Sequence, residues 1–166
     1  MSSLGRQKKQ PGVWDRAYRL RWDDVRYAPG KLEVVTYRNG KEWARDTVKT
    51  TGAPARLVLE AESRTVASDG EDVCYVNVSV RDAEGLVVPN AKLPVSFALE
   101  GSGEIVATDN GDETDFGDFH SPSRSTFNGW AQVIVRANRG AVGVLRLTAS
   151  SDGLKPCTAE IAITDY

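Results

Sequence analysis

Five carboxylates lie within one ten-residue stretch of the sequence: Asp109, Asp112, Glu113, Asp115 and Asp118. Calcium prefers clustered oxygen ligands on a flexible loop, so Asp109, Asp112 and Asp115 are the candidate metal ligands. The spacing differs from that of an EF-hand, because Gly111 and Thr114 occupy positions that need an oxygen ligand and a glycine. A solvated acidic loop is the simpler interpretation. Apart from calcium, no cofactor is expected.

Carboxylate pairs also carry out glycoside hydrolysis, which requires one raised and one ordinary pKa set by a pocket. A loop with so much charge and so little apolar cover offers no obvious means of raising a pKa, so no catalytic residue is assigned. His120 is the single histidine of the chain and would be the only candidate base of a catalytic triad. One histidine and two cysteines also fall short of the roughly four ligands of a common zinc site.

Aromatic residues lie in and next to the acidic stretch. Phe116, Phe119 and Trp130 are the candidate carbohydrate contacts, because a rigid aromatic ring on a loop can stack against a sugar ring. The alternative is that these rings fill the end of the domain or dock against a neighbouring domain. Long loops in compact proteins usually pack with their own side chains, which favours this alternative.

The two cysteines, Cys74 and Cys157, lie far apart in the sequence. Each falls on the apolar side of a stretch that alternates between apolar and polar residues. The favoured interpretation is therefore two buried thiols that pack as small apolar groups. A disulfide between Cys74 and Cys157 is the alternative, and it would require an oxidising compartment.

Alternation of apolar and polar residues dominates the sequence, and no stretch of helical length keeps a 3.6-residue period, so the chain is predicted to be all-β. In the first half, strands at 31–38 and 41–49 flank Asn39-Gly40, which is typical of a two-residue hairpin turn. A short strand is also predicted at 18–22. Such a small sheet leaves an apolar face and an open edge unless something covers them.

The second half, from about residue 55 to 166, has strands and turns at regular spacing. About seven strands in ~115 residues is typical of an immunoglobulin-like (Ig-like) β-sandwich. The predicted strands are 56–62, 73–81, 93–100, 104–108, 127–137, 142–151 and 157–164.

The charge of the chain is unevenly distributed. Residues 1–49 hold 12 Lys and Arg against 6 Asp and Glu, whereas residues 50–166 hold 9 against 17. This change predicts two units with a boundary near residue 50. The basic residues alternate with apolar ones as on a solvated strand face, so no nucleic-acid partner is expected. No membrane partner is expected either, because no apolar run approaches the ~20 residues of a membrane-spanning helix.

Several short motifs carry a resemblance to known families. The motifs Ala67-Ser68-Asp69-Gly70, Asp82-Ala83-Glu84-Gly85 and Asn128-Gly129-Trp130-Ala131 resemble the bacterial Ig-like domain of the invasin and intimin type. Further motifs at 103–112, 119–122 and 127–129 resemble the C-terminal domain of β-galactosidase-like family 2 glycoside hydrolases. Residues 20–25 and 27–32 resemble the end of the Ig-like domain that precedes it in those enzymes.

The resemblance implies three segments: the C-terminal part of a truncated Ig-like domain at 1–50, a linker at 51–54, and a complete Ig-like sandwich at 55–166. The family's catalytic glutamates lie in a barrel of ~250 residues, for which this chain has no room, and no Asn-Glu dipeptide occurs. The chain is therefore not expected to be an enzyme by itself. A periplasmic or cell-surface location is also implied by the family alone.

The implied function is that of a non-catalytic C-terminal accessory region, which supports domain packing, cleft shaping or assembly in carbohydrate degradation. The expected partners are the remaining domains of the parent glycosidase, and carbohydrate is a second expected partner. The alternatives are a carbohydrate-binding module and an adhesin-like Ig module.

Overall fold

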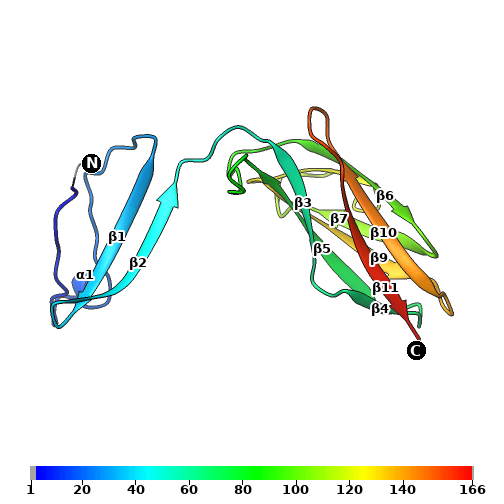
Figure 1. Ribbon diagram of the computed structural model, residues 1–166, viewed down its shortest axis with the longest axis horizontal. Coiled ribbons are helices and arrows are strands. Elements are labelled where there is room, and N and C mark those ends of the chain that lie inside the picture. The colour runs from blue at the N-terminus through cyan, green and yellow to red at the C-terminus, as the bar shows by residue number, and fades with distance from the viewer. Residues whose placement is uncertain (1–2, 166) are drawn as a thin grey trace. The chain divides into compact units, whose positions relative to one another are not determined.

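The computed structural model describes residues 3–165, which divide after Thr50 into two compact units (Figure 1). Unit 1 contains one helical turn, α1 (Trp14–Ala17), and two strands, β1 (Lys31–Arg38) and β2 (Lys41–Lys49). The strands form the predicted antiparallel hairpin, with Lys31 opposite Lys49. Asn39 and Gly40 have φ angles of 52° and 78°, and this left-handed backbone is what the tight Asn-Gly turn requires.

The strand predicted at 18–22 is wrong. This segment is irregular and has no backbone pairing partner among residues 3–165, although it alternates between apolar and basic residues. The carbonyl of Arg21 instead accepts a hydrogen bond from the side chain of Gln7 (2.5 Å). Alternation alone therefore does not produce a strand where no neighbouring strand is available to pair with it.

Unit 2 is the predicted all-β, Ig-like sandwich of two sheets (Figure 1). The four-stranded sheet has the order β3 (Arg56–Ala61), β5 (Val73–Arg81), β9 (Trp130–Ala137) and β7 (Gly103–Asp109). The five-stranded sheet has the order β4 (Thr65–Ala67), β11 (Cys157–Thr164), β10 (Gly143–Ser150), β6 (Pro94–Glu100) and β8 (Ser123–Ser125). All neighbouring pairs are antiparallel except β4 and β11, which are parallel.

The core of unit 2 lies between the two sheets and is built by the alternation seen in the sequence. On β9 and β10 every second side chain is buried between the sheets, as the pleat of a strand requires. The residues with no exposed surface include Val76, Val78, Val80, Val95, Val133, Val135, Leu145, Leu147 and Ile161. Because these side chains are aliphatic and close-packed, their burial is the main stabilising contribution to the unit.

Both cysteines lie at this core, on different sheets. Cys74 on β5 is buried and Cys157 on β11 is partly buried, and both are free thiols. Burial raises the pKa of each thiol, which disfavours the reactive thiolate. Packing as apolar groups stays the favoured prediction for both cysteines, with a Cys74–Cys157 disulfide as its alternative. Among residues 3–165, no helix has the length and apolar character needed to cross a membrane.

The separation into two units predicts how unit 2 behaves alone. A chain of residues 51–166 should unfold in a single cooperative transition, because all of its core contacts lie within the unit. Thermal unfolding followed by circular dichroism checks this. A broad, non-cooperative transition would contradict the boundary.

Candidate functional site

The acidic loop, defined here as residues 109–122, connects β7 of the four-stranded sheet to β8 of the five-stranded sheet. Thr108, at the end of β7, fixes the returning part of this loop. The backbone N–H of Thr108 donates to the carbonyl of Phe119 (2.7 Å), and its hydroxyl donates to the carbonyl of Ser121 (2.9 Å). Thr108 is fully buried, so the loop is tied to the interior of the sandwich at this point.

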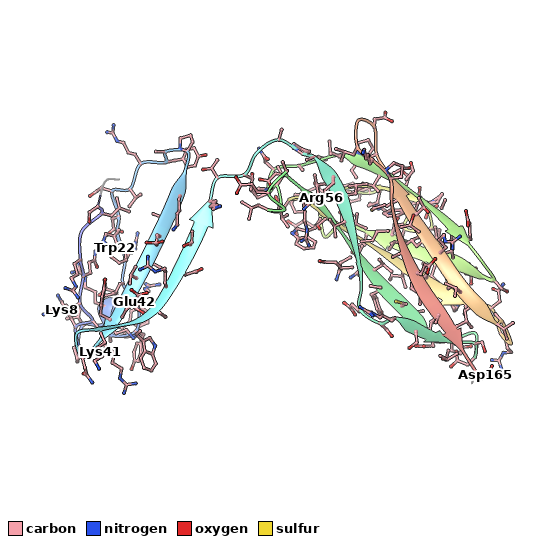
Figure 2. The ribbon with its side chains drawn as sticks, viewed as in Figure 1. Lys8, Trp22, Lys41, Glu42, Arg56 and Asp165 are labelled. Atoms are coloured by element: carbon pink, nitrogen blue, oxygen red, sulfur yellow. The ribbon has the colours of Figure 1, made fainter. Side chains whose placement is uncertain are left out.

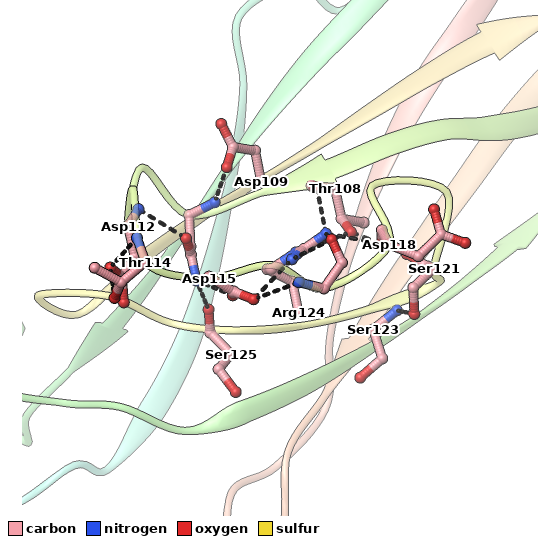
Figure 3. Close-up of polar contacts among 12 residues, drawn as sticks. Thr108, Asp109, Asp112, Thr114, Asp115, Asp118, Ser121, Ser123, Arg124 and Ser125 are labelled. Atoms are coloured by element: carbon pink, nitrogen blue, oxygen red, sulfur yellow. Dashed lines mark hydrogen bonds and ion pairs between the residues drawn. The ribbon is translucent and has the colours of Figure 1, made fainter.

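A buried cation organises the loop (Figure 3). The side chain of Arg124, in the middle of β8, is only 3% exposed. Its guanidinium donates to the carbonyls of Thr108 (3.0 Å), Gly117 (3.4 Å) and Asp118 (2.8 Å), and it forms an ion pair with Asp115 at 3.3 Å. A buried charge is tolerated only when it is paired and hydrogen-bonded, so these partners must hold the loop in this conformation.

The sequence reasoning missed Arg124 and the short strand that carries it. A three-residue strand, Ser123–Ser125, is too short to show a period, and nothing in an Arg between two serines signals burial. The short strand β4 was missed for the same reason. The one signal in the sequence is the group of five nearby carboxylates, which favours a cationic partner. It does not show that this partner is Arg124.

The aspartates of the loop bind the loop's own backbone. The carboxylate of Asp112 accepts from the N–H and hydroxyl of Thr114, that of Asp115 accepts from the N–H of Gly117 (2.9 Å), and that of Asp118 accepts from the N–H of His120 (2.9 Å). These are Asx turns, in which an Asp side chain mimics a backbone turn.

The same hydrogen bonds set the charge state of the loop. They hold the pKa of Asp115 and Asp118 below its usual range, chiefly through the N–H groups of Gly117 and His120. The pKa of Asp112 is also lowered, first by its hydrogen bond from the Thr114 hydroxyl. These carboxyl groups are therefore ionised at neutral pH, and none of them is suited to act as a general acid.

The candidate metal ligands Asp109, Asp112 and Asp115 are each used by the loop itself. Asp109 accepts from the N–H of Asn110 (2.7 Å), and Asp115 pairs with Arg124. In the described part of the chain, no three His, Cys, Asp or Glu side chains are grouped so that they could hold a metal ion. Calcium binding by these residues stays a prediction.

The structure brings two of the three candidate carbohydrate contacts together. Phe116 and Phe119 line one shallow hollow of about 640 Å³ over the acidic loop, together with Asp112, Asp118 and His120. Phe119 is half exposed and lies beneath the guanidinium of Arg124, with 5.3 Å from the guanidinium carbon to the ring centroid. Phe116 is 93% exposed, so it does not fill the end of the sandwich.

Trp130, at the start of β9, does not line that hollow. It is 41% exposed and lines a second, smaller hollow with Asn77 and Gln132. His120 is exposed and contacts Asp118, with 3.3 Å between Nδ1 and Oδ1. The ring of His120 thus contacts one of the loop's own carboxylates at the edge of the first hollow.

The role of Arg124 can be tested against an exposed arginine. The substitution Arg124→Met should lower the free energy of unfolding by about 2–4 kcal/mol, because it leaves three carbonyls and Asp115 without their buried donor. Arg146, whose side chain is 52% exposed and paired with Glu160, is the matched control. The substitution Arg146→Met should cost less than about 1 kcal/mol. Denaturant unfolding measures both values, and equal losses would contradict the organising role of Arg124.

The lowered pKa values predict acid sensitivity of the loop. A carboxyl group whose pKa is lower in the folded state stabilises the protein above its unfolded pKa, and this contribution is lost as the pH falls through the folded pKa. The ordinary value for Asp118 is 3.8, so the loss should occur below about pH 4. The substitution Asp118→Asn removes this titration, and the free energy of unfolding should then fall less steeply with acid. An unchanged slope in denaturant unfolding between about pH 5 and pH 2 would be the opposite result.

A family model matches residues of each of the two units. Residues 57–160 match the family model described as glycoside hydrolase family 2 C-terminal domain 5, and residues 1–44 match one described as a domain of unknown function (DUF4982). The chain is 33% identical over 138 residues to the beta-galactosidase BoGH2A of Bacteroides ovatus, which covers 83% of this chain and 16% of that protein.

Solved structures give the same result. A glycosyl hydrolase family 2 member from Bacteroides cellulosilyticus superposes with a TM-score of 0.89 at 27% identity, over 97% of this chain and 20% of that one. A beta-glycosidase from Bacteroides vulgatus gives a TM-score of 0.76 at 26% identity, over 83% of this chain and 18% of that one. The chain thus spans about a fifth or less of these proteins. Because the family model covers more than half of the chain, this chain belongs to the family of glycoside hydrolase family 2 C-terminal domains, with residues 57–160 forming the matched domain.

Proposed function

We propose that the chain is a non-catalytic accessory region of a family 2 glycoside hydrolase that packs against the remaining domains of the enzyme. The observation that carries this proposal is the lack of a core in unit 1. No residue between 3 and 50 is buried, although the segment contains three tryptophans and forms a regular hairpin. A two-stranded sheet without a covered apolar face is marginally stable in water, so unit 1 needs a partner.

The surface that needs this partner is the hairpin face, defined here as Leu32, Val34 and Val48. Leu32 and Val34 are two residues apart on β1 and therefore share one face, and Leu32 lies directly opposite Val48 on β2. Their exposed fractions are 55%, 43% and 65%. Grouped, exposed aliphatic side chains of this kind are typical of a surface that another domain covers.

A second feature of unit 1 supports the same proposal. The indole N–H of Trp22, labelled in Figure 2, is buried and has no hydrogen-bond partner within residues 3–165. An unpaired buried donor costs free energy, and an added domain can provide the acceptor. The beta-galactosidase of Bacteroides ovatus contains a large additional part beyond the region that matches this chain, which makes such partners available in the relatives.

The carboxyl groups support the non-catalytic part of the proposal. Every Asp or Glu with a resolved shift in the described residues has a lowered pKa. Glycoside hydrolysis by two carboxylates needs one of them protonated at working pH, which requires a raised pKa. The chain alone should therefore not hydrolyse a chromogenic galactoside.

A hybrid enzyme tests the packing role. This chain replaces the matching region of the Bacteroides ovatus beta-galactosidase, and the hybrid is expected to fold and to hydrolyse its substrate. The substitution Val34→Asp should lower the melting temperature of the hybrid by several degrees, because it places a charge in a covered face. In the isolated chain the same substitution should have a smaller effect, because Val34 is 43% exposed there and the new charge faces only Asp46 across the hairpin.

The matched control is Val142→Asp in unit 2, where the valine is 76% exposed. It should leave the melting temperature unchanged both in the hybrid and in the isolated chain. If Val34→Asp is as harmless in the hybrid as in the isolated chain, the hairpin face is not covered by the enzyme, and the proposed packing surface is wrong.

A further inference from the structure

The hollow over the acidic loop has the features of a ligand site that the packing role does not use. We propose that it binds one uncharged sugar ring, with Phe116 as the surface on which the ring stacks. The hollow measures about 640 Å³, which lies within the range of small-ligand sites in proteins. It lies in unit 2, so the proposal does not depend on the hairpin face of unit 1.

The exposure of Phe116 is the first step of the argument. A phenyl ring that is 93% exposed loses the free energy that its burial would provide. The ring lines the hollow together with Phe119, so a flat apolar ligand placed there removes both from water. The C–H face of a pyranose is such a ligand, and an aromatic ring is a rigid platform for it.

The rigidity of the loop is the second step. Arg124 binds three backbone carbonyls and Asp115, and the Asx turns of Asp112, Asp115 and Asp118 fix the chain on both sides of Phe116. A ring on a mobile loop would lose conformational entropy when a ligand orders the loop, and this loss would weaken binding. A loop that is already ordered avoids most of this cost. The loop is thus built to present Phe116 in a fixed place.

The acceptors around the hollow are the third step. Asp118 makes its contacts with His120 through Oδ1, and its side chain is 72% exposed, so Oδ2 faces water. Glu113 also lines the hollow, whereas Asp112 is only 9% exposed and is used by Thr114. Ionised carboxylates accept hydrogen bonds and cannot donate them, which suits the hydroxyl groups of a sugar.

The same charges define the class of sugar. The hollow is lined by Asp109, Asp112, Glu113, Asp115 and Asp118, and the one histidine beside them is exposed. Of these carboxylates, Asp115 is paired with buried Arg124, while Lys92 lies 3.9 Å from Asp112. A uronic acid or a sulfated sugar would bring another negative charge into this group and be repelled. Uncharged sugars such as galactose avoid that cost.

Native gel electrophoresis of the full chain in polysaccharide-containing gels tests the proposal. Galactomannan and β-1,4-galactan should retard the chain, and polygalacturonate should not. The substitution Phe116→Ala should weaken retardation by at least about tenfold in apparent Kd, and Phe116→Trp should preserve it. Because Phe116 is exposed, Phe116→Ala should leave the melting temperature unchanged, which separates lost binding from lost folding.

The matched control is Trp43→Ala, which removes an aromatic ring of 65% exposure from unit 1 and should not alter retardation. Absence of retardation by both neutral polysaccharides overturns the proposal, as does equal retardation by polygalacturonate. If Phe116→Ala leaves gel mobility unchanged but lowers the melting temperature of the hybrid enzyme, Phe116 contacts another domain, and the sugar site is wrong. None of these outcomes depends on the hairpin face, so failure here is distinguishable from failure of the packing role.

Discussion

The buried guanidinium of Arg124 is the constraint on which the acidic loop of unit 2 depends. A charge that is only 3% exposed must find acceptors nearby, and the carbonyls of Thr108, Gly117 and Asp118 provide them. Thr108 directly precedes the acidic loop, and Gly117 and Asp118 lie within it, so one cation ties the middle of the loop back to the strand from which it leaves.

The aspartates Asp112, Asp115 and Asp118 therefore stabilise the conformation of the loop. Each Asx turn uses a carboxylate oxygen to fix a backbone N–H, and the same hydrogen bonds keep the carboxyl groups ionised. This combination opposes acid catalysis by Asp112, Asp115 and Asp118, since a general acid needs a raised pKa and theirs are lowered. It leaves a fixed, negatively charged rim around the exposed ring of Phe116, which is the arrangement that the proposed sugar site uses.

The sequence predicted the features that depend on neighbouring residues alone, and it did not predict those that depend on contacts with other parts of the fold. Val76, Val78 and Val80 repeat one parity over a nine-residue strand, and Asn39-Gly40 specifies a turn on its own, so these elements were predicted correctly. The strand at 18–22 showed alternation but no partner, and pairing is a property of the whole sheet. Arg124 was missed because its burial depends on carbonyls that only the folded loop brings together.

The two units satisfy the same physical requirement in different ways. Unit 2 has two sheets, and the alternating aliphatic residues of each cover those of the other, so its core is closed within residues 51–166. Unit 1 has alternating residues of the same kind on β1 and β2 but only one sheet, so Leu32, Val34 and Val48 stay exposed. A sheet cannot bury its own face, whatever its propensity, because burial needs a second layer. The exposed face of unit 1, on which the proposed packing role rests, is thus a consequence of its strand count, whereas the acidic loop of unit 2 is held in place by contacts within that unit.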